Sequence, residues 1–278
     1  MILLEWLEHA SKRLAVAGID SPSLEAQILA GHVLLKDRPW IVAHPDAEIN
    51  DLAAESVLQR REGREPLAYI LGWREFYGRR FRVRPGVLIP RQDTEILLET
   101  TLELAEAGPV LDLGTGSGCL AATIKLERPD LIVHATDISD LALDVARENA
   151  QDLGAKVEFV RSDGFEAISD KYELIVTNPP YVADHEVLMP EVALHEPSNA
   201  LYAGPTGLEF YMRLASEAGQ HLLPNGILAM ELGHTQAIAA TRVFVEKGWH
   251  KVEIRKDLSD IDRVLVVQWT ANSRPAII

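Results

Sequence analysis

The chain has 278 residues, of which 47% are hydrophobic and 25% are charged, and these values are ordinary for a globular protein. Its formal net charge is -15, so duplex DNA would be repelled unless a local basic face opposed the net charge. Cys119 is the only cysteine, which excludes an intramolecular disulfide, suits a reducing compartment and leads us to expect a cytoplasmic protein.

The N-terminal region, residues 1–71, has the apolar spacing of a small helical bundle, and no strand pattern interrupts it. Ser21 and Pro22 offer a helix cap followed by proline at the first helical position. A further helix is expected from Asn50, as its cap, to Gly63. The acidic N-terminus has only a short apolar run, which predicts neither a secretory signal nor a membrane span.

The pattern changes over residues 72–92. Phe81 and Val83 alternate with arginines between glycines and prolines, which predicts a short hairpin or connector joining two domains. Arginines are dense in and before this region, at positions 60, 61, 64, 74, 79, 80, 82, 84 and 91. They form either an ordinary solvated surface or a docking face for an anionic partner.

Short apolar runs alternate with helical stretches over residues 93–278. The expected strands are 110–113, 131–137, 157–162, 174–177, 227–231, 252–254 and 264–269. Runs that are apolar throughout are typical of strands buried on both faces of a sheet. Repeated strand–helix–strand units predict an α/β fold with an open, doubly wound, Rossmann-like sheet.

A glycine-rich loop follows the first of these strands, in the sequence Val110-Leu-Asp-Leu-Gly-Thr-Gly-Ser-Gly118. Its glycines allow a sharp turn and let a ligand approach the backbone closely. A dinucleotide-binding loop would have the spacing G-x-G-x-x-G, with a helix N-terminus aimed at a pyrophosphate. The spacing here is G-x-G-x-G, which argues against a dinucleotide.

Aspartates accompany three of the expected strands, at Asp112, Asp137 and Asp163. Asp137 stands about twenty residues beyond the loop. A carboxylate at this position can accept hydrogen bonds from the hydroxyl groups of a ribose. Asp112 favours a cationic ligand over a phosphate. S-adenosylmethionine has a ribose, a sulfonium and an ammonium but no phosphate, so the pattern predicts this cofactor, with S-adenosylhomocysteine as product. The alternative is a tight turn with solvent-facing aspartates.

The fourth strand ends in Asn178-Pro179-Pro180-Tyr181. The two prolines impose a stiff extended turn. The carbonyl groups of the Asn178 side chain and the Pro179 main chain can accept both hydrogens of an –NH2 group, and Tyr181 offers a flat face for a planar substrate. Because an amide nitrogen is a weak nucleophile, such positioning would favour methyl transfer. The alternative is a proline turn with Tyr181 in the core.

Together these motifs resemble the PrmC/HemK family of protein-(glutamine-N5) methyltransferases, and the resemblance covers nearly the whole chain. It extends to Glu65–Gly72, Glu75–Gly78, Leu88–Glu95, His195–Pro197 and Gly204–Tyr211. The resemblance implies a helical domain that docks a class 1 peptide-chain release factor, followed by a class I S-adenosylmethionine-dependent methyltransferase domain. The implied reaction methylates the side-chain amide nitrogen of the glutamine in the partner's Gly-Gly-Gln motif and so modulates translation termination.

The resemblance also assigns roles to positions of this chain. The residues implied to bind the methionine part of the cofactor are Gly114, Thr115, Gly116, Ser117 and Gly118. Asp137 is implied to bind the ribose. The residues implied to bind the substrate amide are Asn178, Pro179, Pro180 and Tyr181, and Asn178 is implied to touch the cofactor as well.

Two positions depart from the family pattern. Gln92 stands where the family usually has proline, and Gly164 stands where some members carry a tryptophan against the adenine. Asp163 and the Gly164 backbone are the expected adenine contacts in its place.

Two other functions remain open from the sequence. A nucleic-acid adenine-N6 methyltransferase would use the same Asn178 acceptors, but it needs a positively charged channel for a flipped base. The methyltransferase half is the more acidic part of this chain and shows no target-recognition insertion. A non-catalytic scaffold would bind the cofactor without transferring its methyl group. We expect neither stable nucleic-acid binding nor membrane binding. We also expect no metal site, since the histidines show no spacing typical of metal ligands.

Overall fold

The computed structural model describes residues 1–270, which form two compact units. The first unit comprises Met1–Trp73 together with Leu188–His195, and the second comprises Arg74–Val187 and the chain from Glu196 onward. The last residues of the predicted 93–278 domain lie outside the described part. Within residues 1–270, no helix combines the length and apolar character needed to span a bilayer.

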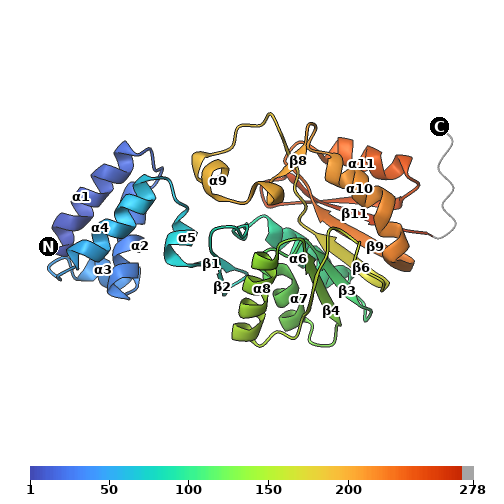
Figure 1. The fold of residues 1–278 in the computed structure, drawn as a ribbon, viewed down its shortest axis with the longest axis horizontal. Helices are drawn as coiled ribbons and strands as arrows, with labels where there is room; N and C mark the ends of the chain where they lie inside the picture. Colours follow the sequence, from blue (N-terminus) through green and yellow to red (C-terminus); the bar gives the residue numbers. More distant parts are fainter. Residues whose placement is uncertain (271–278) are drawn as a thin grey trace. The chain divides into compact units, whose positions relative to one another are not determined.

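The first unit is helical (Figure 1). Its helices are α1 (Leu3–Val16), α2 (Pro22–Leu34), α3 (Arg38–Ala43), α4 (Asp51–Glu62), α5 (Leu67–Leu71) and α9 (Pro190–His195). On α1 the buried residues Leu3, Trp6, Ala10 and Leu14 recur at spacings of three and four, so they form one apolar face against the bundle core. Asn50 caps α4 as expected, since its side chain accepts a hydrogen bond from the Ala53 amide at 3.1 Å.

Helix α9 comes from the second half of the sequence, yet it belongs to the first unit. Its Glu191 accepts a hydrogen bond from Arg61 at 3.2 Å and lies 3.3 Å from the guanidinium of Arg64. Arg61 also donates to Glu25, and it is only 5% exposed. This buried ion network therefore fixes residues 188–195 to the N-terminal helices.

The second unit is built on a seven-stranded sheet with the strand order β10-β11-β9-β6-β3-β4-β5. Its strands are β3 (Val110–Leu113), β4 (Val133–Asp137), β5 (Glu158–Arg161), β6 (Tyr172–Thr177), β9 (Leu222–Glu231), β10 (His250–Lys256) and β11 (Asp262–Gln268). The first five in chain order pair in parallel, whereas β11 is antiparallel to both β9 and β10. The carboxyl ends of β3, β4, β5, β6 and β9 consequently share one edge.

Helices cover both faces of this sheet (Figure 1). They are α6 (Thr94–Leu104), α7 (Cys119–Glu127), α8 (Asp140–Leu153), α10 (Glu209–Glu217) and α11 (Ala237–Glu246). Val110 of β3 packs in a core with α6 and α7, and the next residue, Leu111, packs in a core with α10 and α11. Burial on both faces explains why β3 is apolar at almost every position, and it confirms the open α/β sheet that the sequence predicts.

Two small sheets lie outside the seven-stranded sheet. Strands β1 (Trp73–Phe76) and β2 (Arg79–Arg82) pair with each other, and so do β7 (Val182–Ala183) and β8 (Tyr202–Gly204). The predicted hairpin is therefore confined to residues 73–82. Val87 and Ile89, which continue the alternating pattern, are buried in irregular chain instead.

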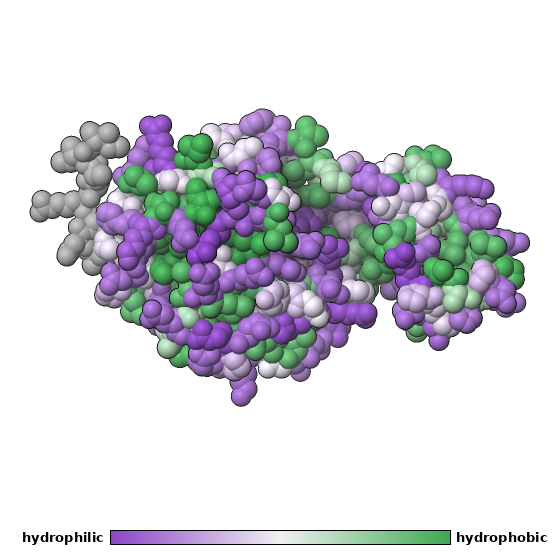
Figure 2. Space-filling model, turned by 180° about the vertical axis from the view of Figure 1, so that it is seen from behind, coloured by the Kyte–Doolittle hydropathy of each residue, from purple (hydrophilic) through white to green (hydrophobic). Residues whose placement is uncertain are grey.

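The arginine-rich stretch is largely neutralised by acidic side chains. The pairs are Arg60–Glu65, Arg61–Glu25, Arg64–Glu191, Arg79–Glu127, Arg82–Asp152, Arg84–Glu148 and Arg91–Glu196. Figure 2 shows hydrophilic and hydrophobic residues intermixed over the visible face. Because most of these charges are compensated within the chain, the structure favours an ordinary charged surface over an anion-docking face.

Candidate active site

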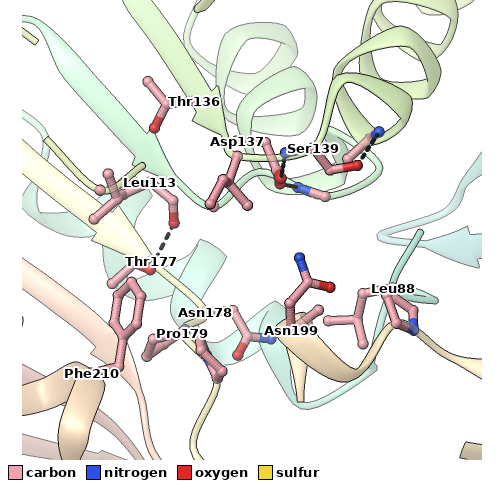
Figure 3. A pocket seen from close by; sticks show the side chains of 18 of the residues that line it. Leu88, Leu113, Thr136, Asp137, Ser139, Thr177, Asn178, Pro179, Asn199 and Phe210 are labelled. Carbon is pink, nitrogen blue, oxygen red and sulfur yellow. Dashed lines mark hydrogen bonds between the residues drawn. The ribbon is translucent and has the colours of Figure 1, made fainter. Parts of the chain in front are cut away.

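A cavity of about 310 Å³ opens at the carboxyl edge of the sheet, within the second unit. The segments that follow β3, β4, β5 and β6 line it, together with residues 86–88, 197–203 and Phe210. In Figure 3, Asp137 and Asn178 lie on opposite sides of the cavity, and Phe210 lies beside Thr177 and Pro179. Ligands of open α/β sheets bind at this edge, so the cavity is the candidate site.

The glycine-rich loop forms one wall. The amides of Gly114 and Thr115 both donate to the Thr136 carbonyl, at 2.9 and 2.8 Å, which holds the loop against the end of β4. Gly114 and Gly116 have positive φ values of 76° and 57°, and no atom lies within 4 Å of where a Cβ would project. A ligand can therefore approach the backbone at these two glycines.

Gly118 differs from the other two loop glycines. It also has a positive φ, but a Cβ there would lie 2.9 Å from the Cβ of Ala146 on α8. Gly118 lines neither this cavity nor the smaller one beside it. In the structure it lets α7 and α8 pack closely, and its predicted contact with the cofactor remains a prediction.

Asp137 is attached to the same loop. One carboxylate oxygen accepts from the Gly116 amide at 2.8 Å, and the other accepts from the Ser139 amide at 2.9 Å. Burial raises the pKa of this carboxyl above its usual value, while the two backbone amides oppose that rise. The hydrogen bonds fix the orientation of Asp137 at the cavity wall and leave lone pairs for hydroxyl donors.

Asp112 lies deeper, at 1% exposure, on a second cavity of about 40 Å³. Its carboxylate accepts from the Thr115 hydroxyl at 2.6 Å and from the Ala121 amide at 3.2 Å. Burial raises its pKa to about 7, although these hydrogen bonds lower it. Ser117 lines the same small cavity, as does Arg91, whose guanidinium the sequence interpretation did not include in the site.

The turn after β6 contributes Asn178, Pro179 and Pro180 to the large cavity, and Asn178 also lines the small one. The Asn178 side-chain nitrogen donates to the Thr94 hydroxyl at 3.1 Å. Within residues 1–270 its side-chain oxygen accepts no hydrogen bond, so it is available to a ligand. This geometry is compatible with the acceptor role that the motif predicts for Asn178, and that role stays a prediction.

Tyr181 lines neither cavity. Its hydroxyl donates to the buried carboxylate of Glu231 at 3.2 Å. Burial and the nearby Glu231 raise the pKa of the phenol. The stacking of Tyr181 on a substrate remains a prediction. Its contact with Glu231 was not predicted from the sequence.

The segment after β5 brings Asp163 and Gly164 to the large cavity. The Asp163 carboxylate is paired with Arg213, whose guanidinium also donates to the Asp163 carbonyl at 3.0 Å. Phe165 turns away and stacks on His221. Two aromatic residues that the sequence did not single out, Tyr202 and Phe210, line the cavity; they follow β6 in the chain and come from β8 and α10.

The family described as Methyltransferase small domain matches residues 90–204, and the PrmC N-terminal domain matches residues 5–72. The chain is 44% identical to a release factor glutamine methyltransferase of Bordetella pertussis, over 87% of this chain and 93% of that protein. The chain belongs to the release factor glutamine methyltransferase family.

Further relatives and the fold agree with this family. A release factor glutamine methyltransferase of Koribacter versatilis is 40% identical over 96% of this chain and 98% of its own length. A methyltransferase of Pyrococcus furiosus with a known crystal structure matches with a TM-score of 0.56 at 19% identity, over 70% of this chain and 91% of that chain. The second unit therefore has the class I methyltransferase fold, as the resemblance predicts.

Proposed function

We propose that this chain transfers a methyl group from S-adenosylmethionine to the side-chain amide nitrogen, N5, of the glutamine in the Gly-Gly-Gln motif of class 1 release factors. Membership of the release factor glutamine methyltransferase family supports this reaction. The observation that carries the proposal within the structure is the free acceptor of Asn178 at the boundary of the two adjoining cavities.

The residues of the cavities fit S-adenosylmethionine. Gly114 and Gly116 leave open space that a Cβ would fill, so the cofactor can lie against their backbone. Asp137 suits the two ribose hydroxyls, since its carboxylate only accepts hydrogen bonds when ionised. In the small cavity, Asp112 and Arg91 suit the ammonium and carboxylate of an amino acid.

The charged sulfur of the bound cofactor would supply an already reactive methyl group and leave as S-adenosylhomocysteine, while the amide nitrogen would give up one of its two hydrogens as a proton. The protein's part is then to hold the amide. The Asn178 side-chain oxygen and the Pro179 carbonyl accept the two N–H groups, which orients the nitrogen lone pair and favours electron density on it. Pro180 keeps this turn extended, because proline fixes its own backbone and restricts the residue before it.

The helical unit formed by residues 1–71 has, in this proposal, the role of docking the release factor. Its match to the PrmC N-terminal domain supports that role. We also retain the prediction that the protein acts in the cytoplasm, where its substrate would be found.

Mass spectrometry tests the reaction. The protein is incubated with S-adenosylmethionine and either a purified release factor or nucleic acid. We expect a gain of one CH2 on the Gly-Gly-Gln glutamine and none on nucleic acid. Asn178→Ala should fold but lose transfer. Methylation of nucleic acid alone, or of neither substrate, would refute the proposal.

A further inference from the structure

A chain of hydrogen bonds runs behind Asn178, inside the second unit. Thr94 at the start of α6 accepts from the Asn178 side-chain nitrogen at 3.1 Å and donates to Glu231 at 2.6 Å. Glu231 ends β9, which lies beside β6 in the sheet, and its other carboxylate oxygen accepts from Tyr181. Thr94 is 3% exposed and Glu231 is 2% exposed. A buried carboxylate thus supports the turn that carries Asn178.

The direction of each hydrogen bond follows from the ionised carboxylate. An ionised carboxylate can only accept, so the single hydroxyl hydrogen of Thr94 must point to Glu231. The Thr94 oxygen then has only lone pairs to offer, and the group facing it must be the –NH2 end of Asn178. The Asn178 oxygen is consequently the end that remains for a ligand.

We propose that Glu231 and Thr94 are positioning residues that orient the Asn178 amide, so that its oxygen rather than its nitrogen faces the substrate. This inference rests on the proposed amide methylation, in which Asn178 accepts a substrate N–H. These linked hydrogen bonds also make the Asn178 side-chain oxygen a stronger acceptor, because hydrogen bonds that run from amide to hydroxyl to carboxylate polarise one another. Glu231 lines neither cavity and Thr94 lines only the small one, so both are proposed to act on the substrate through Asn178.

Protonation of Glu231 on the oxygen that faces Thr94 would reverse the chain. A protonated carboxyl donates to Thr94, whose own hydrogen then seeks an acceptor on Asn178. The amide would turn its oxygen inward and present –NH2 to a substrate that also offers hydrogens. Two donors facing each other cannot form the required hydrogen bond, so the enzyme should act with Glu231 ionised.

The charges around Glu231 place this protonation near neutrality. Burial raises the pKa of Glu231 to about 7, while the hydrogen bonds from Thr94 and Tyr181 lower it. Asp93 beside Thr94 raises the pKa further, and Arg263 of β11 opposes it. Arg263 also forms an ion pair with Asp93 at 3.0 Å, so its positive charge is divided between Asp93 and Glu231.

Substitutions at Thr94 separate positioning from packing. Thr94→Val keeps the shape but removes the hydroxyl, whereas Thr94→Ser keeps the hydroxyl. Thr101→Val is a matched control on the same helix, since Thr101 is fully buried and donates only to the Leu97 carbonyl. Because Thr94 also lines the small cavity, kcat is measured at saturating S-adenosylmethionine. We expect Thr94→Val to lower this kcat about tenfold, which corresponds to ~1.4 kcal/mol. Thr94→Ser should restore kcat, and Thr101→Val should leave it unaltered.

The pH dependence of Glu231→Gln provides the second test. Glutamine is neutral at every pH, so the ratio of wild-type kcat to Glu231→Gln kcat should be near one well below pH 7 and rise through pH 7. Asp112 also titrates near this pH, but it is present in both proteins and cancels in the ratio.

The outcomes distinguish the two proposals. A wild-type enzyme that does not methylate release factor refutes the proposed function itself. An active wild type with a pH-independent ratio, or with full kcat in Thr94→Val, refutes the positioning role alone. If Thr94→Val does not fold, as judged by its unfolding curve, the pH ratio of Glu231→Gln decides.

Discussion

Three glycines with similar backbone angles allow strain, packing and ligand space to be separated. The φ values are 57° at Gly116, 77° at Gly118 and 74° at Gly154. Alanine at such a left-handed position costs about 1–2 kcal/mol. Gly154 caps α8, and no atom lies within 4 Å of an added Cβ, so Gly154→Ala should lose only this amount.

Gly118→Ala adds a collision to the same strain. Its Cβ would lie 3.0 Å from the Ala146 Cα, which is backbone that cannot yield cheaply. Overpacking of this kind costs about 1–3 kcal/mol, so the total loss of stability should be about 2–5 kcal/mol. Urea unfolding of Gly118→Ala and Gly154→Ala measures the difference directly.

Gly116→Ala should resemble Gly154→Ala in stability but differ in binding. Its methyl group would project into the candidate site, where the cofactor is proposed to approach the loop. We expect calorimetric titration to show weak or absent S-adenosylmethionine binding for Gly116→Ala and wild-type binding for Gly154→Ala. Equal affinities in the two variants would refute the assignment of this loop to the cofactor.

Three further predictions concern buried charges. Asp137→Ala should weaken S-adenosylmethionine binding by about ten- to a hundredfold in calorimetry, since a hydrogen bond to a charged group contributes ~1.5–3 kcal/mol. Arg61→Ala should cost about 3–5 kcal/mol in urea unfolding, because Glu25 loses its partner and Glu191 keeps only Arg64. Burial raises the pKa of Asp112 to about 7 from 3.8, so its contribution to stability is present below pH 3.8 and lost as pH rises through 7. Asp112→Asn should remove this pH dependence from the unfolding midpoint.

The sheet could be predicted from sequence because its strands are buried on both faces. The predicted strand 110–113 coincides with β3, and the end predicted for the fourth strand is the end of β6. Strand direction was beyond this reasoning. The antiparallel β11 is as apolar as a parallel strand, and only its pairing with β9 reveals the difference.

The site was partly predictable for a similar reason. Asp137 and Asn178 follow predicted parallel strands, and such residues converge at one edge of a sheet. The same rule, applied to the strand predicted at 227–231, would have selected Glu231. Thr94 offered no signal, since its contact with Glu231 joins residues far apart in sequence.

The placement of α9 means that the two units cannot be separated by a single cut. The chain passes between them after Trp73, after Val187 and after His195. In a fragment ending at Trp73, Arg61 would lack its partner Glu191. A fragment starting at Arg74 would contain α9 without the N-terminal helices against which it packs. Exchange of the N-terminal unit between relatives would therefore require residues 188–195 to be exchanged with it.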